Sequence, residues 1–323
     1  MNNILKKKDK SLWQYIIILI GMLLLMVLLL GCDKKSININ DTEFTSMTIH
    51  ENFNWSAGNW IINDSLALNL KTPVCRYPAE GYYYQIYEDL WPSLGDYDFN
   101  DVVLKSYMIY RTNTKEGTIY SKVLRDAGGL SPHNVGFEIL KYTPNKLFYI
   151  DTSKVNVNNI RYIKYNGSVS LNYEFDNDQN LIYFNKIHTN DSLIFDFQFH
   201  PGHVPFFIQP FISLKNNTSK EMHIYGYPPS DNVDISYFNT KDDASDVNKL
   251  YNEKANGFWN LGDLFYNTSN YYPWGIELVS DTFYIPLERT EILLAYPQFK
   301  GWAESNGTLN TEWFKYPDIN YCY

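Results

Sequence analysis

Short runs of aromatic and β-branched residues, broken repeatedly by Asn, Asp, Gly and Pro, constrain this chain more than any other feature. Tyr, Phe and Trp make up 17% of the sequence. Such residues favour strands, and the residues between them favour turns. The runs predict strands at 59–63, 102–110, 147–150, 160–165, 181–184, 193–199, 206–208 and 221–225. No repeat of about 20 to 50 residues is visible, which disfavours a propeller or solenoid.

The economical architecture for such a pattern is mainly β: an antiparallel β-sandwich, jelly-roll-like, with few short helices. The run 102–110 is apolar on both of its alternating faces, which is typical of a central strand. A short helix is expected between Glu288 and Tyr296, because Pro297 would end it.

An acidic string precedes the central strand and suggests a cation site. Asp96, Asp98 and Asn100 alternate with Tyr97 and Phe99, so an extended backbone would place the polar groups on one face and the rings on the other. Calcium takes about 6 to 8 oxygen ligands, and closely spaced carboxylates and amides supply them. The alternative is an ordinary solvated turn, since the same residue types favour turns.

The string does not match an EF-hand loop. Asp101 stands where the sharp-turn Gly should be, and Tyr107 occupies the position of the bidentate Glu. Extended alternation would also turn Asp101 away from the other three polar residues, so a bulge or tight turn is needed if all four bind one ion.

The wider segment Tyr87–Val103, read as YEDLWPSLGDYDFNDVV, resembles the signature of the LruC domain family. Later strings resemble that family in order: HNVGF at 133–137, PFI at 210–212, EMHIYGYPP at 221–229, PWGIE at 273–277 and AYPQFKGWA at 295–303. Val135 departs from the Gly more often found there. The resemblance spans roughly 82–314 and implies a bacterial envelope lipoprotein with a β-rich domain. It also implies a calcium site with Asp96, Asp98, Asn100 and Asp101 as ligands, and Glu88 and Asp89 as additional carboxylates.

The N-terminus has the pattern of a bacterial lipoprotein signal. Four lysines between positions 6 and 10 precede the apolar run Tyr15–Leu30, which ends at Gly31-Cys32. Cleavage after residue 31 would leave Cys32 acylated, which predicts a membrane as partner and attachment outside the cytoplasm, expected at the outer membrane. A retained transmembrane anchor is the rival, but the run is shorter than the roughly 20 residues that a span prefers. Periplasmic and surface orientations both stay open.

The expected organisation is a signal peptide (1–31), a polar tether (32–41), an N-terminal β segment (42–80) and an LruC-like β-sandwich domain (81–323). The segment 42–80 either joins the sandwich or forms a small lead-in sheet. Without the signal, 23 basic residues face 35 acidic ones, a net charge of about −12 that argues against nucleic acid as a partner. Cys75 and Cys322 could pair or stay free.

Other chemistry has weaker support. His200 and His203 flank a Pro-Gly turn, but zinc needs three or four ligands. Glu138, Glu277 and Glu288 are carboxylates of the type that a glycosidase uses, and no nucleophile or phosphate motif is present. Dense aromatic clusters at 82–84 and 271–274 could contact a glycan or a protein.

We therefore expect a non-enzymatic, lipid-anchored envelope protein. In it, a β-sandwich stabilised by structural calcium serves adhesion or binding of a glycan or protein ligand. A carbohydrate-active protein, either a glycan-binding module or a hydrolase, is the alternative.

Overall fold

The computed structural model describes residues 44–51, 53–56, 61–62, 74–127, 132–142, 147–149, 155–200, 206–260 and 265–323, all within one structural unit, 39–323. The signal peptide, Cys32, the tether, His203 and much of the segment 42–80 lie outside the described residues. Within these ranges, no helix combines the length and the apolar character that a membrane span needs.

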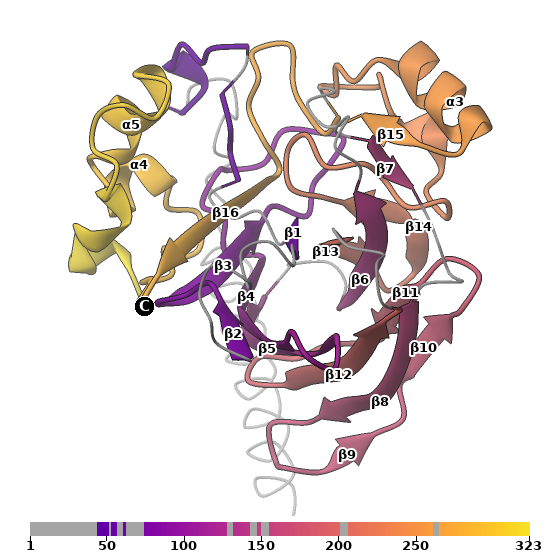
Figure 1. The fold of residues 1–323 in the computed structure, drawn as a ribbon. Coiled ribbons are helices and arrows are strands. Elements are labelled where there is room, and N and C mark those ends of the chain that lie inside the picture. The colour runs from indigo at the N-terminus through magenta and orange to yellow at the C-terminus, as the bar shows by residue number, and fades with distance from the viewer. Residues whose placement is uncertain are drawn as a thin grey trace, which may run out of the picture. The chain divides into compact units, whose positions relative to one another are not determined.

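Two antiparallel sheets dominate the fold, which confirms the predicted mainly-β class and is consistent with a β-sandwich (Figure 1). Sheet A has the order β16-β3-β4-β5-β12-β8-β9, and β2 also pairs with β4. Its strands are β2 (Val74–Tyr77), β3 (Tyr82–Tyr87), β4 (Val102–Arg111), β5 (Glu116–Asp126), β8 (Val155–Ile163), β9 (Val169–Ser170), β12 (Ser192–Phe199) and β16 (Gly275–Ser280). The predicted central strand is β4, which lies between β3 and β5.

Sheet B has the order β1-β13-β6-β11-β10, with β14 on β13, and with β7 on β6 and β15 on β7. Its strands are β1 (Ile61–Ile62), β6 (His133–Tyr142), β7 (Leu147–Tyr149), β10 (Tyr173–Asp176), β11 (Leu181–Phe184), β13 (Phe206–Leu214), β14 (Asn217–Met222) and β15 (Trp259–Asn260). The segment expected at 42–80 therefore contributes β1 to sheet B and β2 to sheet A.

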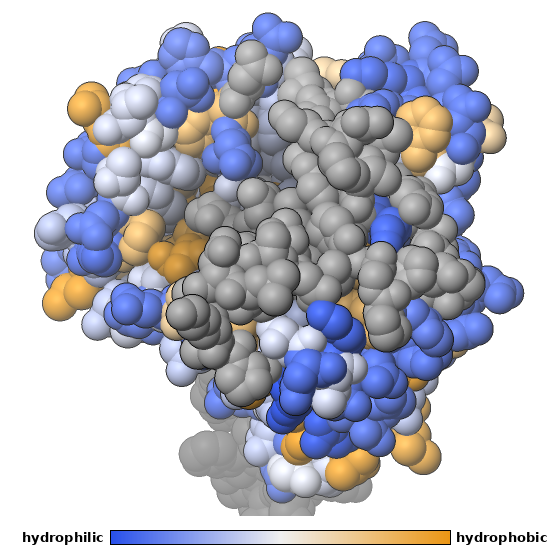
Figure 2. Space-filling model, viewed as in Figure 1, coloured by the Kyte–Doolittle hydropathy of each residue, from blue (hydrophilic) through white to orange (hydrophobic). Residues whose placement is uncertain are grey.

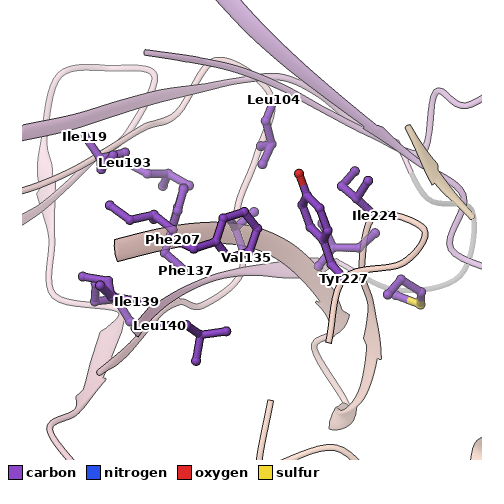
Figure 3. Close-up of a cluster of buried hydrophobic side chains, with 14 of the residues drawn as sticks. Leu104, Ile119, Val135, Phe137, Ile139, Leu140, Leu193, Phe207, Ile224 and Tyr227 are labelled. Carbon is purple, nitrogen blue, oxygen red and sulfur yellow. The ribbon is translucent and has the colours of Figure 1, made fainter. Parts of the chain in front are cut away.

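The sandwich core lies between the two sheets. Leu104 of β4, Ile119 of β5 and Leu193 of β12 come from sheet A, and Phe137 and Ile139 of β6 come from sheet B, as Figure 3 shows. All five are fully buried. Alternation along the strands puts apolar side chains on this inner face, as the period of two requires.

A second cluster, here called the outer core, covers the other face of sheet A at its β16-β3-β4 end. It combines the N-terminal segment with the C-terminal helices that Figure 1 draws beside β16. Its members include Phe44, Phe53, Trp55, Tyr84, Ile86, Tyr97, Phe99, Val103, Ile276, Ile292, Tyr296, Phe299 and Trp313. The outer core therefore joins the two ends of the described chain.

In the described part of the chain, the helices are few and short, as predicted. They are α3 (Val247–Asn256), α4 (Ile292–Ala295) and α5 (Phe299–Glu304), with the 3₁₀ turns η2 (Phe44–Ser46), η4 (Ile235–Tyr237), η5 (Trp313–Lys315) and η6 (Ile319–Tyr321). The α4 helix falls inside the predicted 288–296. Cys75 and Cys322 are both free thiols.

The dense aromatic clusters are mostly buried, although Tyr82 and Tyr271 are partly exposed. Tyr83, Tyr84, Tyr272 and Trp274 are each less than 5% exposed. Two apolar cores, one on each face of sheet A, bury more aromatic side chains than a single sandwich core would. On the face that Figure 2 shows, the described surface is mainly hydrophilic, with dispersed hydrophobic residues.

We predict that Gly136→Ala destabilises the fold by about 1–3 kcal/mol, because it overpacks sheet B. A Cβ at Gly136 would lie 2.2 Å from Cζ of Phe211, its cross-strand partner. Phe211 cannot swing aside freely, since its buried ring stacks on His223 with centroids 4.3 Å apart. Denaturant unfolding would measure the change.

Val169→Ala, at a strand position that is 69% exposed, is the control and should alter the free energy of unfolding by less than about 0.5 kcal/mol. Equal stability of the two variants would contradict the close packing of Gly136 against Phe211.

Candidate metal centre

The acidic string forms part of the loop 88–101, which joins the antiparallel neighbours β3 and β4. The two ends of the loop are tied together, because the Asp89 N–H donates to Oδ2 of Asp101 over 2.8 Å. The Glu88 N–H donates to the Trp274 carbonyl, next to β16. The loop is thus fixed at the edge where β3, β4 and β16 begin or end.

The backbone of the string is not extended, which corrects our expectation. Tyr97 and Phe99 have positive φ angles of 56° and 51°. Left-handed backbone costs a residue other than Gly roughly 1–3 kcal/mol and is found at ligand clamps. Both rings are buried in the outer core, and the Tyr97 ring stacks on Phe44 with centroids 4.0 Å apart. Ring burial therefore offsets the backbone strain and holds the loop tightly folded.

The tight loop brings three predicted ligands together. One carboxylate oxygen from each of Glu88, Asp96 and Asp98 lies within 4.8 Å of the other two. Glu88 and Asp98 are at most 1% exposed, and Asp96 is partly buried. Among the described residues, this is the one group of three His, Cys, Asp or Glu side chains that meets that distance.

One oxygen of Glu88 has no hydrogen-bond partner. Oε1 of Glu88 accepts from the Phe99 N–H over 2.6 Å, whereas the buried Oε2 accepts from no group. Both oxygens of Asp98 accept backbone N–H donors, from Asn100 and Arg289. A buried carboxylate oxygen without a donor is costly, and a cation beside Glu88 would supply the missing charge.

Gly95 makes room for this arrangement. A Cβ at Gly95 would lie 2.0 Å from Oε2 of Glu88. Only a residue without a side chain lets the loop backbone approach the Glu88 carboxylate so closely.

Burial and mutual repulsion favour the protonated forms of these carboxyl groups. Burial, followed by the charges of Asp98, Asp101 and Asp96, holds the pKa of Glu88 well above its usual range. Burial and the same kind of repulsion raise the pKa of Asp98 to about 9. The pKa of Asp96 is also raised, first by burial and then by Glu288. The cluster therefore needs either protons or a cation to be stable at neutral pH.

Asn100 and Asp101 flank the three carboxylates and hold the loop. The Asn100 amide is already engaged, because its Oδ1 accepts from Nε of Arg125 at 3.3 Å and its Nδ2 donates to the Pro286 carbonyl at 3.0 Å. Asp101 accepts the Asp89 N–H, and burial, followed by the Asp89 charge, raises the pKa of Asp101 to about 7.

His133 is part of this neighbourhood, and its contacts beside the acidic loop were not predicted. Its Nδ1 lies 2.7 Å from Oδ1 of Asp126, and its Nε2 lies 3.2 Å from Oδ2 of Asp89. Burial alone would lower the pKa of His133, but the hydrogen bonds with Asp126 and Asp89 outweigh it and raise the pKa to about 9. The imidazolium therefore ties the base of the loop to the end of β5. Asp126 lies only seven residues before His133, but Asp89 lies 44 residues before it, and no local spacing in the sequence links His133 to Asp89.

The other candidate carboxylates have structural partners. Glu277 is 1% exposed and accepts hydrogen bonds from Nε2 of Gln85 and Oγ of Ser56. Glu138 is fully buried and bonded to Gln209. Glu288 is exposed and paired with Arg125 at 3.0 Å. His200 is exposed, and its expected partner His203 lies outside the described residues.

Comparisons with known proteins give one family. A solved structure of a candidate lipoprotein from Bacteroides ovatus is similar at 15% identity and a TM-score of 0.43, covering 76% of this chain and 77% of that one. No curated protein matches the sequence. The family model described as "Domain of unknown function (DUF4842)" matches residues 151–314, about half of the chain, and begins after the acidic loop. The chain therefore belongs to the DUF4842 family.

Proposed function

We propose that this is a lipid-anchored cell-envelope protein whose β-sandwich is stabilised by calcium at the acidic loop, and that it serves adhesion or ligand binding without catalysis. One observation carries the calcium proposal. The unpartnered Oε2 of the buried Glu88 belongs to a side chain that converges with Asp96 and Asp98.

The donor set favours calcium among common metals. All three side chains offer hard carboxylate oxygens, without the nitrogen or sulfur ligands that zinc prefers. Magnesium demands near-octahedral geometry and retains its waters, whereas calcium accepts irregular sets of oxygens. Waters or carbonyl groups would complete the shell. The resemblance to the LruC family implies the same ion, and we include membership of that family in this proposal.

Calcium at this site would stabilise the folded state. The ion would neutralise the carboxylates of Glu88 and Asp98, and Asp98 also accepts the N–H of Arg289. It would thus hold the end of β3, the acidic loop and the segment before α4 together. Binding to the native state alone stabilises a protein by about 2.7 kcal/mol when the free ion is at 100 times its dissociation constant.

A non-catalytic role is favoured over the hydrolase of the carbohydrate-active alternative. Glu277, a candidate carboxylate, and Trp274, of the aromatic cluster 271–274, are both buried. Glu138 is buried as well, so a substrate would reach neither carboxylate without opening the fold. The envelope location rests on the sequence of residues 1–32 and on the LruC resemblance.

Calcium titration of the metal-free protein tests the site. We expect wild type and the control Asp178→Asn, at an exposed carboxylate, to bind calcium, and Glu88→Gln and Asp98→Asn to bind at least about tenfold more weakly, since each loses a charged ligand. Glu88→Gln should also raise the melting temperature of the metal-free protein, because the neutral amide removes the cost of burying or protonating the Glu88 carboxylate. The proposal fails if wild type takes up no calcium, or if both site variants bind like wild type.

The pH dependence of stability gives a second test. Folding raises the pKa of Asp98 to about 9 and that of Asp101 to about 7, so above pH of about 4 the folded state holds more protons than the unfolded state. The stability of the metal-free protein should therefore fall as the pH rises from about 4 to about 9. Calcium competes with these protons, so its stabilising effect should grow over the same interval.

Melting temperatures with and without calcium, measured across that interval, check this expectation. His133, whose pKa is also raised to about 9, adds a fall of the same sign. The readout is therefore the difference between the two curves. A difference that stays constant with pH would contradict proton displacement from these carboxylates.

Acylation at Cys32 can be tested directly. Cys32→Ser should abolish incorporation of labelled palmitate and release the protein from the membrane fraction, because the acylated thiol is lost. Cys75→Ser, at a buried free thiol, is the matched control and should keep the label. Retention of the label in Cys32→Ser would overturn the anchor assignment.

A further inference from the structure

Three tyrosine rings lie close together on the face of sheet A that also carries the outer core, next to that core. Tyr107 of β4 and Tyr120 of β5 are cross-strand partners, and their rings stack with centroids 4.7 Å apart and an interplanar angle of 7°. Tyr82 meets Tyr107 edge to face at 5.9 Å. All three are partly exposed, unlike the buried tyrosines of the two cores.

Cationic side chains surround these rings. Nζ of Lys105 lies 3.8 Å from the centroid of the Tyr82 ring, and the Arg76 guanidinium lies about 5 Å from the Tyr82 and Tyr107 rings. Lys122, the cross-strand partner of Lys105, is exposed. The cations thus line up beside the aromatic group along neighbouring strands.

A hollow of about 320 Å³ opens at this place, which is within the usual range of ligand sites. Tyr82, Tyr107, Tyr120, Lys105, Lys122 and Ser192 line it, and among the described residues no carboxylate does. This is unusual for a chain with a net charge of −9. We call this site the tyrosine-lysine hollow.

A neighbouring hollow on the same sheet lacks this character. There, Arg161 lies beside Asp196, which also accepts hydrogen bonds from Thr118 and Asn159. Its positive charge is compensated internally. The tyrosine-lysine hollow instead presents two ammonium groups without lining acids, so charge complementarity favours an anionic ligand.

The chemistry of the lining indicates which anion. Aromatic rings pack against the CH faces of sugar rings, phenol hydroxyls exchange hydrogen bonds with sugar hydroxyls, and the ammonium groups attract carboxylates. A uronic acid presents all three features on one ring. The stacked tyrosines are also held in place before binding, so little side-chain entropy is lost.

We propose that the tyrosine-lysine hollow binds an acidic polysaccharide through its uronic acid residues. This deepens the ligand-binding part of the proposed function by naming the ligand class and its site, and it does not depend on calcium at the acidic loop.

Calorimetric titration of the full-length protein with a hyaluronan hexasaccharide, which contains glucuronate, tests the proposal. The carboxyl-reduced hexasaccharide and poly-glutamate serve as comparison ligands. We expect binding of the acidic sugar that weakens as salt rises, and much weaker binding of the other two. Lys122→Ala and Tyr107→Ala should each lower the affinity about tenfold or more. Lys315→Ala and Tyr316→Ala, at exposed positions, should not.

Absence of binding, equal binding of the reduced sugar, or unchanged affinity in Lys122→Ala would overturn the proposal. Tighter binding of poly-glutamate would assign the hollow to acidic peptides instead and overturn it as well. Because Lys122 is exposed, its substitution stays informative even if Tyr107→Ala fails to fold. Calcium and sugar titrations of the wild-type protein separate the two proposals: sugar binding without calcium uptake refutes only the acidic loop, and calcium uptake without sugar binding refutes only the hollow. Glu88→Gln should lose calcium affinity and keep sugar binding.

Discussion

The mutual repulsion of buried carboxylates at Glu88, Asp96 and Asp98 is the constraint around which this end of the structure is organised. Like charges this close, withdrawn from water, are unfavourable unless something compensates them. Backbone N–H groups of Phe99, Asn100 and Arg289 compensate part of the charge. The remainder is left on the Glu88 oxygen that accepts no hydrogen bond. A fold that keeps such a cluster gives up stability in the metal-free state, which is understandable if a cation restores it.

The acidic loop also explains how the two ends of the chain are joined. Its carboxylates face inward to one another, while the rings of Tyr97 and Phe99 enter the outer core beside Phe44. Disturbing the carboxylates would therefore shift those rings. Because the outer core holds both the N-terminal segment and the C-terminal helices, the effect would extend to residues far away in sequence. Local electrostatics and long-range packing are thus coupled through two residues with left-handed backbone.

Sequence patterns predicted the strands that are apolar and uninterrupted. The run 181–184 coincides with β11, and 102–110 falls one residue short of β4. They missed β5, because Gly117, Ser121 and Lys122 dilute its apolar pattern, although Phe197 covers the gap at Gly117. They also did not predict β3, which contains the whole Tyr82–Tyr84 run. Asp96 and Asp98 could be named as candidate ligands from their chemistry, and Glu88 from the resemblance to the LruC family. The contacts of His133 and the close approach of Gly95 depend on tertiary structure that no local spacing reveals.

Strand β4 links the two proposed sites within one element. It leaves the acidic loop at Val102, places Val103 under the outer core, and carries Lys105 and Tyr107 on the same face further along. The position of one residue in such a strand constrains the positions of the others, because backbone hydrogen bonds to both neighbouring strands fix its register. The register of β4 against β5 therefore places Tyr107 opposite Tyr120. Since β4 pairs with β5 through register-specific contacts up to Arg111, the stacking of Tyr107 on Tyr120 follows from strand pairing, with or without an ion at the acidic loop.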